Sequence, residues 1–162
     1  MTSNIIAIYN AIEGMGVTFT DNAGASITPT IYDRDELESS LQASATPARL
    51  LLPYSDAQAV TATMADFVIG NTSTITWTLI DRFVWRPIGH GAGLRDAAVS
   101  LTNYIGAYMD AVIALDFSGI TDLITVESVT CNVNDFMSIP AGTDNVYVGV
   151  DAIWTLLEDD PI

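Results

Sequence analysis

The sequence contains no lysine, one histidine and one cysteine, and these absences exclude several kinds of site. Cys131 cannot form an internal disulfide, and one cysteine with one histidine supplies too few ligands for a zinc centre. No apolar run approaches the roughly 18 residues of a membrane-spanning helix, and the N-terminus has no secretory-signal pattern. We therefore expect a protein without cofactor or metal, not associated with a membrane, and made without export.

Basic residues are scarce beside acidic ones. The five arginines face 20 aspartates and glutamates, which gives a formal net charge of -15. Because a nucleic-acid groove needs clustered lysine and arginine, no specific nucleic-acid binding is expected. Repulsion on this scale opposes a compact state unless salt screens it, and at 1 M salt the Debye length falls to about 3 Å. The composition is typical of a halophilic protein, and an ordinary acidic protein is the alternative.

Apolar content is high for so charged a chain, with 49% hydrophobic residues and a mean hydropathy of +0.35. Large apolar patches are uncommon on lone monomers, so a partner or a second copy is expected to cover part of the surface. The 162 residues show no repeat or linker, which predicts a single domain over 1–162.

Hydrophobic periodicity predicts an α+β fold. Ile75, Trp77 and Leu79 alternate with threonines, as in a strand with one buried face. The predicted helices are 3–14 and 93–115, and the predicted strands are 17–20, 27–32, 48–54, 72–87, 122–133 and 144–157. The order favours a largely antiparallel or mixed sheet, with an N-terminal helix and one long amphipathic helix packed on one face.

The sequence predicts the structure of three further segments less sharply. Residues 33–47 are acidic and predict a surface loop or a short helix. Residues 55–69 fit either a helix or a strand, and residues 158–162 predict a charged C-terminal tail.

The stretch 78–96 concentrates the unusual residues, with three of the five arginines, the histidine and three glycines. A strand, a glycine loop and a helix form phosphate sites in nucleotide folds, but Leu94 stands where the fingerprint needs glycine. The segment 90–93, HGAG, is similar to an esterase oxyanion loop, yet the chain has no G-x-S-x-G elbow and no second histidine. Carboxylate pairs for glycoside hydrolysis and a Ca²⁺ or Mg²⁺ site at 33–38 stay open, although nothing singles them out. No catalytic residue is predicted.

A docking surface is the remaining interpretation of this stretch. Arginine and tryptophan dominate interface energetics, and arginine pairs bidentately with carboxylates. The alternative is that Arg82 and Arg86 pair only locally, with Asp81 and Asp96. The predicted subunit or partner interface consists of Arg82, Trp85, Arg86, His90 and Arg95.

The order of elements over 48–157 resembles the tail terminators, or tail-completion proteins, at the head–tail neck of long-tailed viruses. The resemblance is carried by a strand with two tryptophans (75–87, ITWTLIDRFVWRP), a glycine-rich turn (89–94, GHGAGL) and a helix with spaced tyrosines, Tyr104 and Tyr108. It implies a non-enzymatic virion protein, assembled in the host cytoplasm, that forms a hexameric ring, caps the tail tube and docks to the head connector.

The resemblance also implies an acidic lumen that repels the passing DNA, and the composition would suit a virus of a salt-loving archaeon. A head–tail adaptor or stopper is the nearest alternative. An acidic cytoplasmic binding module, or a small enzyme of a halophile, is an alternative of another class. The ring number, and which face meets tube or connector, stay open.

Overall fold

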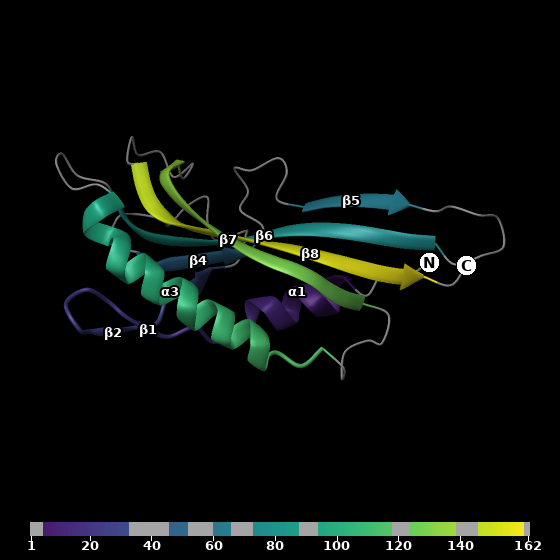
Figure 1. Cartoon of the computed structure of the whole chain (residues 1–162), viewed down its shortest axis with the longest axis horizontal. Coiled ribbons are helices and arrows are strands. Elements are labelled where there is room, and N and C mark those ends of the chain that lie inside the picture. Colours follow the sequence, from purple (N-terminus) through teal and green to yellow (C-terminus); the bar gives the residue numbers. More distant parts are fainter. Residues whose placement is uncertain are drawn as a thin grey trace.

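Three strands of 15 residues each form the centre of the fold. The computed structural model describes residues 5–32, 46–51, 60–65, 73–87, 94–117, 124–138 and 146–160. In chain order the elements are α1 (Ile5–Glu13), β1 (Phe19–Thr20), β2 (Ser26–Ile27), β3 (Thr30–Tyr32), β4 (Ala48–Leu51), β5 (Val60–Ala65), β6 (Ser73–Pro87), α3 (Leu94–Ala114), β7 (Ile124–Ser138) and β8 (Val146–Asp160). Figure 1 shows the helices α1 and α3 on one side of the main sheet.

The main sheet has six strands in the order β3-β4-β6-β8-β7, with β5 paired to β6 beyond the end of β4. All pairs are antiparallel except β3 with β4. The strand β8 lies between β6 and β7, and it pairs with β6 from Ser73↔Asp160 to Pro87↔Tyr147, with one irregularity between Val84 and Arg86. The predicted α+β class is therefore confirmed, with an N-terminal helix and one long helix on a largely antiparallel, mixed sheet.

The alternation along β6 sends one set of side chains into the core. Leu79 and Phe83 are fully buried under the helices, and Ile75 is 9% exposed, as the period-two pattern predicts. Trp77 is half-buried rather than buried, and it packs against the edge of the same core. The threonines of the opposite face are half-buried too, because neighbouring strands on both sides flank them.

The long helix α3 is held on the sheet by a face of large side chains. Leu101, Tyr104 and Tyr108 are at most 1% exposed, and the Tyr104 ring stacks on Phe83 with centroids 3.8 Å apart. Each large apolar side chain that becomes buried contributes about 1.5–3 kcal/mol. The spacing that predicted this helix from the sequence therefore marks its contact with the sheet.

The β1–β2 hairpin is attached to the side of α3. Its turn is closed by Asp21, whose Oδ1 accepts hydrogen bonds from the amides of Ala23 (2.9 Å) and Ala25 (2.8 Å). Gly24 has φ +84°, a conformation that other residues rarely adopt. Asn103 on α3 donates to the Thr20 carbonyl at 2.7 Å. The sequence predicted one strand over 27–32, whereas the chain forms the separate strands β2 and β3 there.

The end of β8 corrects one prediction. Residues 158–160 continue the strand and are not part of a charged tail. Glu158 is 2% exposed, and its Oε2 accepts a hydrogen bond of 2.8 Å from Trp77 Nε1. The carboxylate is buried because β6 and β7 both extend alongside it, which the local composition does not reveal.

Three other predictions concern segments whose bounds or structure were less determined. Within the ambiguous range 55–69, residues Val60–Ala65 form the strand β5. The acidic range 33–47 lies outside the described residues except for its last two positions. The strand β7 continues to Ser138, five residues beyond its predicted end.

Candidate functional site

The side chain of Arg82 is buried against a neighbouring strand of the sheet and is not exposed as a docking residue would be. Arg82 on β6 lies directly opposite Asp151 on β8. Its Nε donates to Asp151 Oδ1 at 2.6 Å and its Nη2 donates to Oδ2 at 2.8 Å, so the pair is bidentate. Both side chains are mostly buried, 10% and 13% exposed. Arg82 therefore fixes the register of the two central strands.

Trp85 also belongs to the fold. Its ring makes edge contacts with Phe19, at a centroid distance of 5.5 Å, and lies 6.1 Å from the ring of Phe83. The side chain is half-buried and packs against the core. Its contacts join the end of β6 to the β1–β2 hairpin, which is a structural role.

The other predicted interface residues differ in exposure. Arg86 is half-buried just after the irregularity in β6, and Arg95 is exposed in the first turn of α3. His90 lies outside the described residues. The structure therefore does not gather the five residues into one exposed cluster within its described part, and Arg86 and Arg95 remain the interface candidates.

The predicted local pairing of Arg82 with Asp81 is wrong. The two residues are neighbours on a strand, so their side chains point to opposite faces of the sheet. Arg82 meets Asp151 on one face. Asp81 lies under the helices on the other face, where its partner is Arg49 of β4.

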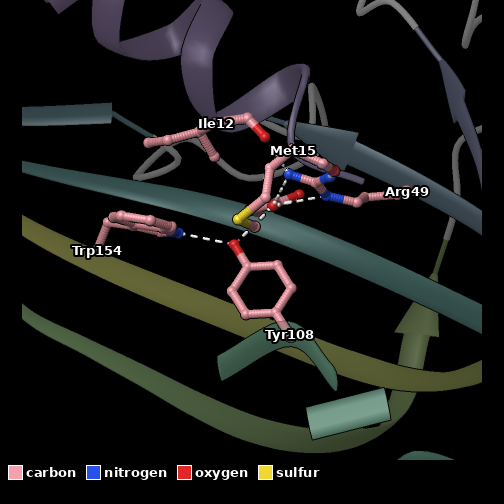
Figure 2. A network of polar contacts seen from close by, with 6 residues as sticks. Ile12, Met15, Arg49, Tyr108 and Trp154 are labelled. Carbon is pink, nitrogen blue, oxygen red and sulfur yellow. Dashed lines mark hydrogen bonds and ion pairs between the residues drawn. The ribbon is translucent and has the colours of Figure 1, made fainter. Parts of the chain in front are cut away.

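Arg49 and Asp81 are the centre of a buried polar network that sequence reasoning missed (Figure 2). Arg49 Nε donates to Asp81 Oδ2 at 2.8 Å, and Tyr108 Oη donates to the same oxygen at 2.7 Å. Trp154 Nε1 donates to Tyr108 Oη at 2.7 Å. Arg49 and Asp81 are only 2% and 1% exposed. The network joins β4, β6, α3 and β8 in the interior of the protein.

The same guanidinium also caps a helix. Arg49 Nη2 donates to the carbonyl of Ile12, and Nη1 donates to the carbonyl of Met15 (Figure 2). The last carbonyls of a helix have no partner within the helix, and burying them without one is costly. Arg49 satisfies the carbonyls at the end of α1 and places its charge at the negative end of the helix dipole.

The electrostatics of the network favour fixed protonation states. Burial lowers the pKa of Arg49, but Asp81 beside it outweighs that effect and the net pKa is raised. Burial, followed by the Asp81 charge, raises the pKa of Tyr108 far above its usual range, and the same causes raise that of Tyr104. Both tyrosines therefore stay protonated, and Tyr108 acts as the hydrogen-bond donor to Asp81. The network therefore stabilises the fold.

Two sequence signals point to this network. Asp81 shares its strand face with Leu79 and Phe83, so the period-two pattern already directs a carboxylate into the core. Arg49 stands within the apolar run 48–52, where a charge needs a partner. Their pairing could not be predicted, because it depends on the antiparallel register of β4 with β6.

No group of three or more histidine, cysteine or acidic residues in the described segments could hold a metal ion. Among the depressions of the described surface, one of about 250 Å³ is lined by residues of α3, and one of about 140 Å³ lies between α3 and Val133 of β7. Burial raises the pKa of Cys131 to about 11, so its thiol is unreactive at neutral pH. No helix among the described residues is long and apolar enough to span a membrane.

The comparisons with known proteins give no relative. No protein-family model matches the sequence, and no curated protein matches it. Functional inference therefore depends on the chain itself.

Proposed function

We propose that this chain is a structural virion protein: a ring-forming tail terminator at the head–tail neck of a long-tailed virus. The observation that carries the proposal is the arrangement of β6, α3, β7 and β8. A strand with two tryptophans leads to a long helix, which Tyr104 and Tyr108 hold against the sheet, and two strands follow. This is the order of elements on which the resemblance to tail terminators rests.

The sheet edges also support assembly into a ring. Within the described segments, β7 pairs only with β8 and β5 pairs only with β6, so each leaves one edge without a partner strand. The two edges lie on opposite sides of the sheet and differ in sequence. Unpaired edges are templates for strand pairing between chains. A contact between two different surfaces forms a ring when the rotation between successive subunits closes, and an open filament otherwise.

The charge suits a channel for DNA. A formal net charge of -15 on each subunit makes a ring of such subunits strongly negative as a whole, and this charge repels the phosphate backbone. The scarcity of arginine and absence of lysine leave little to hold DNA in place. The DNA can then slide through the ring without binding to it.

The test combines assembly with function. Light scattering behind a sizing column in high salt should give a ring-sized species, and electron microscopy should show six-fold rings. Added to polymerising tail-tube protein, the chain should stop tube growth and bind the tube ends. Tube growth that continues unchanged, with no protein at the ends, would contradict the proposal. Binding to the head connector without any effect on the tube would instead favour the adaptor or stopper.

A further inference from the structure

The side of α3 that points away from the sheet is exposed and carries few charges. Successive residues of a helix are about 100° apart, and eight positions fall within a sector of roughly 120° opposite the buried face. Met109 among them is half-buried, and the other seven are exposed and define the outer face of α3: Arg95, Ala98, Val99, Thr102, Gly106, Asp110 and Ile113. Val99 is 57% exposed and Ile113 is 83% exposed. These are the exposed large aliphatic side chains of the face, one near each end of the helix.

Among the described residues, no contact explains the glycine at position 106. Glycine is among the poorest residues for a helix interior, because the unfolded chain loses the most freedom there. A Cβ atom built at Gly106 meets nothing within 4 Å, so no neighbour in the described structure requires its absence. A surface that approaches from outside the chain would require it.

The charges at the two ends of this face are opposite. Arg95 and Asp110 are separated by fifteen positions, or about 22 Å of helix, so they cannot meet within one chain. Neither forms an ion pair with another described residue. If two α3 helices lie antiparallel with their midpoint between Thr102 and Asn103, Arg95 of each copy lies beside Asp110 of the other. A parallel arrangement would instead bring like charges together.

The crossing angle is constrained as well. Helices that cross at about 20° are offset sideways by only about 4 Å at these ends, whereas a crossing of about 50° offsets them by roughly 9 Å. The shallow class therefore permits both ion pairs. The depression of about 250 Å³ bounded by Ala98, Val99, Thr102 and Asn103 lies at the midpoint. The Thr102 hydroxyl donates to its own helix, to Ala98 O at 2.8 Å, so covering it leaves no unpaired donor.

We propose that the outer face of α3 binds the same face of a second copy of this chain, with the two helices antiparallel. Two chains of formal charge -15 repel each other. They can approach through the outer face of α3, because its positive and its negative residue cancel in charge and each lies opposite its counterpart on the other copy. The helix covers only about 30 Å by 10 Å, less than the roughly 800 Å² per partner of a standard interface, so the dimer is weak. The contact does not depend on ring formation.

Charge reversal tests the contact directly. Sedimentation equilibrium of Arg95→Asp, Asp110→Arg and the double variant is compared with wild type, in the lowest salt at which circular dichroism shows all four to be folded. Each single reversal creates two like-charge pairs per dimer and should raise the dissociation constant at least about tenfold. The double variant should return to within a few-fold of wild type. A monomeric wild type, or single reversals without effect, would overturn the proposal.

Gly106→Leu provides a second test, because it should stabilise the monomer and at the same time abolish the dimer. Leucine favours the helix and its side chain meets open space, so the dilute monomer should melt about 2–4 °C higher. The same side chain should abolish dimerisation by holding the helices apart. Thr130→Leu, on an exposed strand position of the opposite sheet face, is the matched control and should leave the dimer intact. A dimer that survives Gly106→Leu contradicts the proposed contact, whatever the outcome of the ring experiments.

Discussion

Arg49 stabilises α1 from a distant part of the chain. A nine-residue helix is marginal alone, and α1 has no basic residue in its own last turn. Its C-terminal carbonyls are bound instead by a guanidinium from β4, whose charge is balanced by Asp81 of β6. The helix is therefore stable only when the sheet beneath it has formed.

Tyr108 and Tyr104, one turn apart on α3, should respond differently to loss of the hydroxyl. Tyr108→Phe leaves Trp154 Nε1 without its acceptor and removes a donor from Asp81, which should lower the free energy of unfolding by about 1–3 kcal/mol. Tyr104 Oη is buried without a hydrogen-bond partner among the described residues. Tyr104→Phe should therefore be neutral or stabilising.

Urea unfolding of both variants at equal m-values measures the difference. Tyr104→Phe is the matched control, because it removes the same atom from the same helix face. Equal losses in the two variants would contradict the hydrogen-bond assignment of Tyr108.

At the scale of elements, strong periodicity made β6 and α3 predictable to within a residue or two at each end. The alternation of Ile75 with threonine, and the spacing that includes Tyr104 and Tyr108, each reflect a single long contact surface. The strand β5 was not decidable, because its pairing with β6, rather than its own sequence, makes it a strand. For the same reason the burial of Glu158 and the partner of Arg49 could not be predicted.

The pairing of β6 with β8 gives a prediction about Arg82. Arg82→Ser leaves Asp151 mostly buried without its bidentate partner and should cost about 2–4 kcal/mol of stability. Removing both, in Arg82→Ser/Asp151→Ser, should recover part of the loss. The half-buried Arg86 has no comparable pair in the described structure, so Arg86→Ser should change stability by less than about 1 kcal/mol.

Thermal unfolding of the variants distinguishes the ion-paired Arg82 from Arg86. Arg86→Ser is the matched control, because it removes an arginine from the same strand. Arg86→Ser is also the sharper test of docking, because a loss of assembly would not follow from unfolding. If Arg82→Ser melted like wild type, the pair with Asp151 would not stabilise the sheet.

At the scale of the whole molecule, the net charge of -15 predicts that salt stabilises the fold. The melting temperature should rise by several degrees between about 0.1 and 1 M NaCl, as the Debye length falls from about 10 to 3 Å and the repulsion is screened. KCl should act like NaCl, since the cause is ionic strength. A melting temperature independent of salt would indicate that the acidic residues are too far apart to repel.

The position of β8 between β6 and β7 has a kinetic consequence. Its partners on β6 lie 60 to 87 residues earlier in the chain, so the middle of the sheet is closed by contacts of long sequence separation. Such contacts require large loops to close first, which places folding in the range of milliseconds to seconds. Until β8 inserts, β6 and β7 each present an open edge to other chains. Newly made copies at high concentration should therefore be most prone to aggregation before this insertion.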